Sequence, residues 1–303
     1  MASRSLPWLT ITLGVGILLI INVFTSAGWT SDEDDYLAGY TGADAELIGS
    51  DACLMCHSNL NPGNLFTHVA YIDGDPANEY YGYGCEQCHG PGGSHYGNTT
   101  AIINPSKLSG DQLVEQCTRC HESLRTFDRD EFFLSTHYEN DILCLSCHSG
   151  HSANDAFLVN EDAMELCYTC HSEKRAQFNM RSHHPVDEGQ LGCMDCHNPM
   201  SGQFDGQLKA ERDDLCFTCH MDKKGPFMFN HEISLSAGAN GCLTCHFPHG
   251  SNSDNLLQLP SNRLCLQCHT DRTPDSGHFS GACYTSGCHS QIHGSNQNPL
   301  FFN

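Results

Sequence analysis

Positive charge is scarce in this sequence. Its 303 residues include 14 Lys and Arg but 36 Asp and Glu, which gives a formal net charge of −22. Nucleic acids and anionic lipid surfaces both require a basic face on the protein that binds them. The composition therefore argues against both classes of partner, and we expect no nucleic-acid partner.

An uncharged run follows Arg4 at the N-terminus, and the small residues behind it suit cleavage after Ala27. We interpret residues 1–27 as a secretory signal peptide. The alternative is an uncleaved N-terminal anchor, because Leu6–Phe24 is nearly long enough to span a bilayer. Either interpretation predicts that the rest of the chain is exported, and residues 28–50 then form an acidic, solvated linker.

Cysteine is abundant, with 20 residues. In an exported protein this number would ordinarily suggest ten disulfides, but the spacing indicates something else. Nine times the chain reads C-x-x-C-H, and a tenth motif, CYTSGCH at 283–289, has two additional residues between its cysteines. These motifs use every cysteine: Cys53, Cys56, Cys85, Cys88, Cys117, Cys120, Cys144, Cys147, Cys167, Cys170, Cys193, Cys196, Cys216, Cys219, Cys242, Cys245, Cys265, Cys268, Cys283 and Cys288. Each motif ends in a histidine: His57, His89, His121, His148, His171, His197, His220, His246, His269 and His289.

This spacing suits covalent haem attachment, because residues i, i+3 and i+4 share one face of a helical turn. Two thiols can form thioethers to one porphyrin while the next imidazole, the proximal ligand, reaches its iron. Zinc sites and disulfides are the competing interpretations. Neither needs a histidine after every second cysteine. The probability that chance places a histidine there in all ten motifs is roughly 10⁻¹². We therefore predict ten c-type haems, and we expect the insertion around Ser286–Gly287 to loop out while the bonds stay the same.

Ten further histidines are available as the second, distal ligands of the irons. They are His68, His95, His137, His151, His183, His184, His231, His249, His278 and His293. They follow successive motifs at alternately long and short distances, so two-haem units begin at Cys53, Cys117, Cys167, Cys216 and Cys265. The near-constant spacing of the last four starts indicates an internal repeat.

One position breaks this repeat. The stretch CHNPM at 196–200 ends in Met200, where equivalent stretches end in histidine, so the short-range histidine expected for the sixth haem is missing. Met200 could be an axial ligand that raises the haem's potential, the pair His183–His184 could provide the imidazole, or Met200 could only pack. We assign every further histidine except His183 as a distal ligand, with Met200 or His183 as the tenth. His184 is preferred because Pro185 fixes the backbone beside it.

Apolar side chains are too few to give each unit a core of its own, so the haems must form the core. Short helices are expected at 160–175 and 209–224, where acidic first turns and basic ends suit the helix macrodipole. We predict a multihaem cytochrome c fold: mostly irregular coil with short α-helices, an elongated array of five two-haem repeats, and essentially no β-sheet. Residues 51–166 would carry haems 1–4 and residues 167–303 haems 5–10, as one continuous domain.

Filled axial positions leave no vacancy on the iron for a substrate, which favours electron conduction over catalysis. We predict an electron-transfer protein with no catalytic residue. A multihaem reductase with an open sixth haem is one alternative, if Met200 does not bind that iron. Such enzymes often replace the proximal histidine with lysine, and no CxxCK motif occurs in this chain.

The chain resembles the MtrA/DmsE family of decahaem cytochromes over roughly Ser50 to Pro299. The resemblance is carried by ACLMCH at 52–57, GCEQCHGPGGSH at 84–95, EKRAQFNMRSHHP at 173–185, CHNPM at 196–200, LCFTCHMDKKGPF at 215–227, CHFPHGSN at 245–252 and CHSQIHGSN at 288–296. It implies a wire of haems, usually bis-histidine, lodged in an outer-membrane β-barrel porin. That family usually has CHNPH where this chain has Met200.

The implied partners are the porin, periplasmic cytochromes that donate or accept electrons, and an extracellular multihaem cytochrome or reductase. The expected location is the periplasm and outer membrane, inside the porin. A soluble periplasmic or filament-forming multihaem carrier is the other alternative, since it would need the same haem chain without the barrel.

Overall fold

The structure is a computed structural model. It describes residues 46–60, 68–78, 81–121, 127–151, 159, 162–231, 241–260, 262–271, 283–284 and 289–302. The expected signal peptide or anchor, most of the acidic linker, His278, Cys288 and the insertion at Ser286–Gly287 lie outside the described residues. Within those ranges, every helix is too short or too polar to cross a bilayer.

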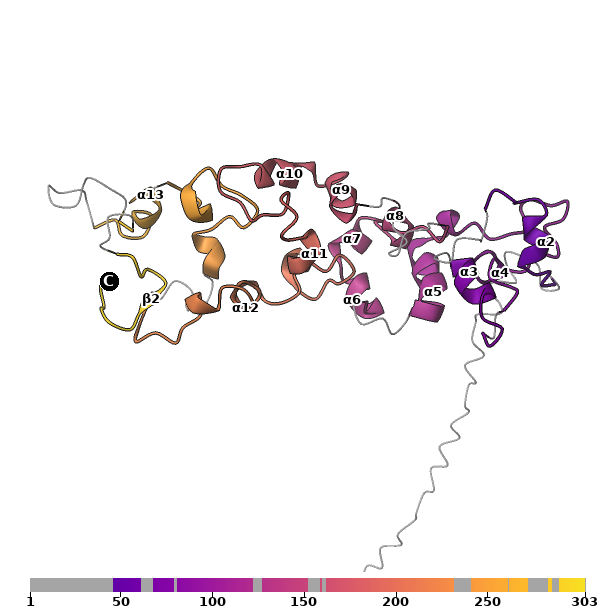
Figure 1. The fold of residues 1–303 in the computed structure, drawn as a ribbon, viewed down its shortest axis with the longest axis horizontal. Coiled ribbons are helices and arrows are strands. Elements are labelled where there is room, and N and C mark those ends of the chain that lie inside the picture. The colour runs from indigo at the N-terminus through magenta and orange to yellow at the C-terminus, as the bar shows by residue number, and fades with distance from the viewer. Residues whose placement is uncertain are drawn as a thin grey trace, which may run out of the picture.

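The chain forms an elongated ribbon (Figure 1), in which α2, α3 and α4 lie at one end and α13 and β2 at the other. The helices are α2 Ser50–Leu54, α3 His68–Asp73, α4 Glu86–His89, α5 Gly110–His121, α6 Arg129–Phe133, α7 Thr136–Glu139, α8 Cys144–Cys147, α9 Ala163–Tyr168, α10 Ser172–Phe178, α11 Cys193–Cys196, α12 Arg212–Phe217 and α13 Asn262–Cys265. Short 3₁₀ turns are η1 Pro105–Lys107, η2 Asp205–Gln207, η3 Met221–Lys223, η5 Gly241–Thr244 and η6 Asp254–Leu256. Short helices joined by coil confirm the predicted fold class.

Strand pairing is minimal in the described part of the chain. Two-residue strands β1 Phe229–Asn230 and β2 Gly294–Ser295 pair antiparallel and join the two-haem units that begin at Cys216 and Cys265. Isolated bridges connect His197 with Leu208, His246 with Leu257 and Ser182 with Ser251. These bridges fasten individual loops, and none extends into a sheet.

The helices that carry odd-numbered motifs are shorter than expected. The helix predicted at 160–175 divides into α9 and α10, because His171 adopts φ −100° and ψ 45° between them. The Thr169 hydroxyl donates to the Leu166 carbonyl at 2.7 Å and so satisfies the end of α9. The helix predicted at 209–224 divides in the same way into α12 and η3. The break turns the motif histidine out of the helix.

Apolar burial is confined to small clusters. The described residues hold nine buried apolar side chains: Ala101, Ile103, Leu113, Val114, Phe132, Tyr168, Phe178, Val186 and Leu257. One cluster unites Tyr168, Phe178 and Val186 beside α9 and α10. So small a core cannot by itself stabilise a domain of this length, which is consistent with haems supplying the missing apolar volume.

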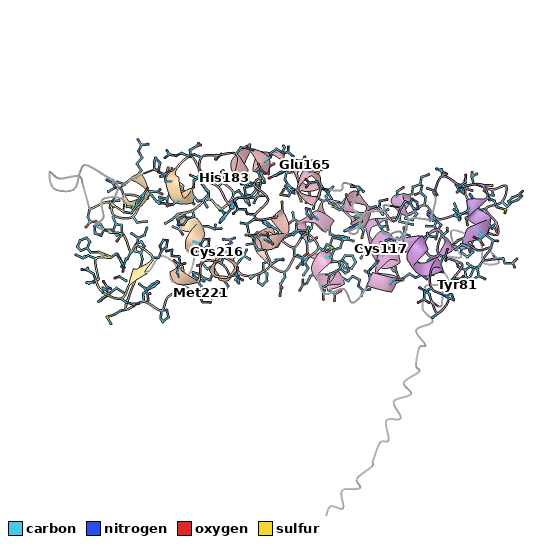
Figure 2. The ribbon with its side chains drawn as sticks, in the orientation of Figure 1. Tyr81, Cys117, Glu165, His183, Cys216 and Met221 are labelled. Carbon is cyan, nitrogen blue, oxygen red and sulfur yellow. The ribbon has the colours of Figure 1, made fainter. Side chains whose placement is uncertain are left out.

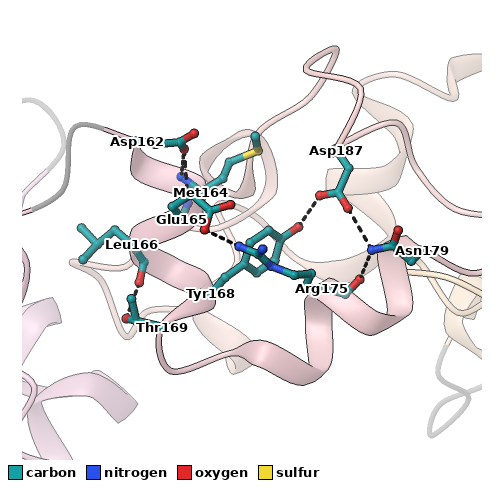
Figure 3. A network of polar contacts seen from close by, with 9 residues as sticks. All are labelled: Asp162, Met164, Glu165, Leu166, Tyr168, Thr169, Arg175, Asn179 and Asp187. Atoms are coloured by element: carbon teal, nitrogen blue, oxygen red, sulfur yellow. Dashed lines mark hydrogen bonds and ion pairs between the residues drawn. The ribbon is translucent and has the colours of Figure 1, made fainter.

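Polar contacts surround that cluster (Figure 3). The Tyr168 hydroxyl donates to Asp187 Oδ1 at 2.8 Å, and Asn179 donates to Asp187 Oδ2 at 3.2 Å. The Arg175 guanidinium lies 4.5 Å from the centroid of the Tyr168 ring and pairs with Glu165. These contacts hold α9 against α10 and so fix the attachment motif between them.

Candidate haem-binding sites

The attachment motifs share one local geometry. In eight of them the backbone amide of the histidine donates to the carbonyl of the first cysteine at 2.8–3.1 Å. These bonds run from His57, His89, His148, His171, His197, His220, His246 and His269 to Cys53, Cys85, Cys144, Cys167, Cys193, Cys216, Cys242 and Cys265. In the expanded motif, His289 still donates to Cys283 at 3.3 Å. The two additional residues therefore leave the ends of that turn within hydrogen-bond reach.

Cysteines of successive motifs lie beside one another in a fixed alternation. Within each unit the first cysteines of the two motifs hydrogen-bond through their side chains: Cys53–Cys85, Cys117–Cys144, Cys167–Cys193, Cys216–Cys242 and Cys265–Cys283. Between units the second cysteines lie close enough for a charge on one to raise the pKa of the other: Cys88–Cys120, Cys147–Cys170, Cys196–Cys219 and Cys245–Cys268. The motifs thus follow one another without a gap from the first to the tenth. Cys117 and Cys216 mark two places along this line (Figure 2).

Among the residues that the structure describes, the cysteines are thiols and not disulfides. All nineteen that fall in the described ranges are free. Burial, followed by the charge of Cys85, raises the pKa of Cys53 to about 11, and burial with Cys283 nearby raises the pKa of Cys265 to about 11. Free thiols are the form that adds to the vinyl groups of a porphyrin.

Eight of the motif histidines face a second imidazole. The pairs, motif histidine first, are His57–His95, His89–His151, His121–His68, His171–His137, His197–His249, His220–His184, His246–His293 and His269–His231. Their ring centroids are 5.8–6.3 Å apart. The structure therefore brings together eight of the candidate distal histidines with eight proximal ones.

These separations fit haem iron. Metal–imidazole bonds of about 2.0 Å and ring radii of about 1.1 Å place the centroids of two axial imidazoles about 6 Å apart. A direct ring-on-ring contact would be closer in the stacked pairs, so the gap suits one intervening metal atom. With two cysteines beside each motif histidine, the residues present fit a c-type haem with two axial imidazoles.

Apart from His95, which faces His57 of its own unit, the facing histidines come from neighbouring units. An even-numbered motif faces the short-range histidine that follows the next even motif, as His89 faces His151 and His246 faces His293. Odd-numbered motifs after the first face the long-range histidine that follows the preceding odd motif, as His220 faces His184. The units are therefore interlocked, and each supplies ligands to the units on either side.

This interlocking corrects the sequence-based interpretation of the sixth haem. His249 faces His197 of the sixth motif at 6.1 Å, so that site has an imidazole and Met200 is not needed there. The physical reason is chain length. Three residues, as between His246 and His249, span at most about 11 Å, which is too short to pass around a porphyrin to the other face of the same iron. A short-range residue must serve another motif.

Backbone carbonyls orient the imidazoles. Nδ1 of His89, His197, His246 and His289 bonds to the carbonyls of Ile103, Gly206, Asn255 and Leu300 at 2.6–2.9 Å. On the distal side, Nδ1 of His137 and His184 bonds to the carbonyls of Pro199 and Pro248 at 3.0 and 2.6 Å. A carbonyl acceptor fixes the proton on Nδ1 and leaves the Nε2 lone pair for the metal.

Burial favours the neutral form of two of the facing rings, His249 and His293. It lowers the pKa of His249 to about 4, with the nearby Lys174 charge as the next cause. Burial, followed by the charge of Lys223, likewise lowers the pKa of His293 to about 4. A neutral imidazole is the form that binds iron.

His183 differs from its neighbour. Its Nδ1 bonds to the Met180 carbonyl at 2.6 Å and its Nε2 to Glu188 at 2.9 Å, so both ring nitrogens already have protein partners. His184 bonds through Nδ1 to the Pro248 carbonyl, and its ring faces that of His220. Geometry therefore favours His184 over His183 as a ligand, and His183 fastens the 180–188 loop instead.

Comparison with known proteins agrees with these sites. The family described as "Doubled CXXCH motif" matches residues 138–176, 183–225 and 236–273. A curated relative, "Multiheme cytochrome MtrA" from Shewanella baltica (strain OS185), is 35% identical over 149 residues, which is 47% of this chain and 44% of the relative. The chain thus matches less than half of the relative's length. These similarities and the motif geometry identify the cofactors as c-type haems.

Proposed function

We propose that this chain, an MtrA-like multihaem c-type cytochrome, conducts electrons along ten haems across the outer membrane, inside a β-barrel porin. It would link periplasmic redox carriers with an extracellular cytochrome, reductase or mineral. The observation that supports this most strongly is the unbroken line of neighbouring attachment cysteines from Cys53 to Cys283. A gap in that line would interrupt conduction.

A bound haem supplies reversible one-electron chemistry between Fe(II) and Fe(III). The protein's part is to hold each group and to keep other chemistry out. At eight motifs two facing imidazoles would hold the iron and would leave a substrate no open coordination site. Carbonyl bonds to Nδ1, such as His246 to Asn255, keep the ligand rings from turning. The alternative of a reductase open at the sixth haem loses its basis, because His249 faces His197.

The count of ten rests on ten motifs with two ligands each. Eight have a facing imidazole among the described residues. For the tenth motif, His278 is the long-range histidine that the interlocking pattern leaves for His289, and it lies outside the described ranges. The fourth motif is taken up below.

A porin is proposed because the chain could not itself face lipid. Its backbone runs largely in loops, whose amides and carbonyls would lack partners in hydrocarbon. The molecule is elongated (Figure 1), as a conductor across a hydrocarbon layer of about 30 Å requires. A barrel would supply the lipid-facing surface and leave the two ends of the chain open to partners.

The test uses the full chain. The cytochrome is purified from outer membranes with the proteins that accompany it, and the assembly is reconstituted in liposomes that hold a trapped redox dye. External reductant should bleach the dye, whereas liposomes with the barrel alone should stay coloured. A cytochrome found only in the soluble fraction, or an assembly that cannot bleach the dye, would favour the soluble or filament-forming carrier.

A matched pair of variants tests the line of sites. Cys167→Ser with Cys170→Ser removes the fifth attachment motif from the middle of the wire and should abolish bleaching, because the fourth and sixth motifs would be separated. Tyr96→Phe alters a side chain that is 92% exposed and should leave bleaching unchanged. Normal bleaching by the double variant would contradict conduction through consecutive sites.

A further inference from the structure

We propose that Met200 is the distal ligand of the fourth haem, opposite His148, and that this haem has histidine–methionine coordination. The inference rests on the proposed function in one respect only, that haem occupies the fourth motif. The sequence alone had left Met200 and His183 as alternative candidates for the ligand of the sixth haem. The thioether sulfur would donate a lone pair to the iron, and no proton or electron is transferred in forming that bond.

The proximal sides of the fourth and sixth motifs have the same construction. Each lies on a four-residue helix, α8 or α11, whose third residue accepts from the amide that precedes the helix: Ser146 from Leu143 at 3.2 Å and Asp195 from Gly192 at 2.7 Å. The histidines that end these helices share a conformation, φ −111° and ψ 152° for His148, φ −107° and ψ 148° for His197. The two motifs therefore hold the backbone of their histidines in the same conformation.

The distal sides also correspond. The Pro248 carbonyl accepts from Nδ1 of His184, and the next residue is His249. In the preceding repeat the Pro199 carbonyl accepts from Nδ1 of His137, and the next residue is Met200. Both residues are half-buried. A ring from the unit before thus fixes the backbone of Met200 as it fixes that of His249.

The interlocking pattern identifies the iron that this position serves. The short-range residue after an even motif faces the even motif before it: His151 faces His89 of the second, His249 faces His197 of the sixth, and His293 faces His246 of the eighth. His95, after the second motif, has no even motif before it and faces His57 instead, so the member of this series that remains is Met200, which follows the sixth motif. By the same step it serves His148 of the fourth.

Nearby imidazoles are engaged elsewhere. His183 uses both ring nitrogens on Met180 and Glu188, and His184 faces His220. Methionine sulfur raises the potential of a c-type haem above that of a bis-histidine one. The fourth haem would therefore be the first of the ten to accept an electron, and it would lie inside the wire rather than at an end.

The experiment uses the intact purified cytochrome. The oxidised protein should show the far-red absorption band of a sulfur-to-iron bond, at the intensity of one haem in ten. Met200→His should abolish the band and lower the potential of one haem, while Met200→Leu should abolish it and produce one high-spin haem. Met228→Leu, at a methionine that is 72% exposed, is the matched control and should retain the band. Absence of the band in the parent protein, or its survival in Met200→Leu, overturns the proposal.

A second variant assigns the haem. His249→Leu should produce a high-spin sixth haem and leave the sulfur band intact. If Met200 served the sixth haem, His249→Leu would leave that iron low-spin, and the assignment to the fourth haem would be wrong. Porin association and dye bleaching test the proposed function separately. If the cytochrome shows the band but does not associate with a porin, the assignment of Met200 stands and the proposed conduit across the outer membrane is wrong.

Discussion

The units that begin at Cys167 and Cys216, taken with the few residues before each motif, repeat one set of backbone and side-chain contacts within the described residues 162–209, 211–231 and 241–258. We call this shared set of contacts the frame. Both units carry a threonine hydroxyl that donates at 2.7 Å to the carbonyl three residues earlier, an ion pair across the helix break, and a cation over an aromatic ring. The threonines are Thr169 and Thr218, and the ion pairs are Glu165–Arg175 and Asp214–Lys224. The same Arg175 and Lys224 lie over the rings of Tyr168 and Phe217. The shared contacts are those that position the attachment motifs.

The loops that follow the even motifs repeat the frame as well. His197 bridges to Leu208 and His246 to Leu257, and each histidine ring bonds to a carbonyl two residues before its bridge partner. Two residues after the ligand position, both copies donate a backbone bond to an earlier segment: Gly202 to the Glu131 carbonyl and Ser251 to the Ser182 carbonyl, and Ser251 also accepts from Ser182. The comparison teaches that the frame is set by the needs of the motifs, so a ligand can change within it without a change of fold.

The largest expected difference between the units concerns the adjacent histidines of the third unit. His184→Ala should leave one haem five-coordinate and high-spin, because its ring faces His220, whereas His183→Ala should keep every haem low-spin. Electron paramagnetic resonance of the oxidised proteins measures this. Equal high-spin signals from both variants would contradict the geometry.

A smaller effect is expected from the glycine after the ligand in the fourth unit. A Cβ at Gly250 would lie 1.9 Å from the Gln177 carbonyl oxygen, so Gly250→Ala must push the loop away and should cost about 3 kcal/mol of unfolding free energy. Gly110→Ala is the control, because its Cβ would meet nothing closer than 3.5 Å. Chemical denaturation followed by haem absorbance measures the free energy of unfolding of both variants. A tolerated Gly250→Ala would show that the loop is not held against α10.

The sequence was sufficient for the parts of the sites that are local. A thioether pair and its histidine require fixed neighbours along the chain, so the motifs could be located directly, and the coil-rich fold followed from the scarcity of apolar residues. The helix expected at 160–175 was wrong, because hydrogen bonding by Thr169 and the turn at His171 end α9 early. Spacing alone cannot reveal such a turn.

The sequence could not show which distal histidine faces which motif histidine. That pairing depends on which residues distant along the chain meet in space, and proximity in sequence was misleading: His249 lies three residues from His246 yet faces His197. The shortness of that segment was the available signal, since it cannot reach around a porphyrin. Without this argument, Met200 and His183 stayed open as alternative ligands of the sixth haem.

The difference between Tyr168 and Phe217 predicts a moderate effect. Tyr168→Phe removes the hydroxyl that donates to Asp187 at 2.8 Å and should destabilise the α9–α10 pair by about 1 kcal/mol. Hydrogen exchange of the amides in 163–191 should quicken several-fold, while exchange in the fourth unit stays unchanged. Tyr96→Phe, at a 92% exposed side chain, should alter neither region. Uniform quickening along the chain would mean that the units do not open separately.

The smallest effect is expected from the ion pairs that the two copies share. Lys224 bonds to Asp214 at 3.3 Å and lies 5.4 Å from the Phe217 centroid, while Arg175 lies 4.5 Å from the Tyr168 centroid. All four charged side chains of these pairs are at least 44% exposed, so solvent and salt screen them. Lys224→Ala should therefore quicken local exchange less than Arg175→Ala, and both less than Tyr168→Phe. High salt should shrink the two charge effects and leave the tyrosine effect in place, because only the charge effects depend on screening. If Lys224→Ala quickened local hydrogen exchange more than Tyr168→Phe did at any ionic strength, the frame would depend on its surface charges rather than on its buried contacts.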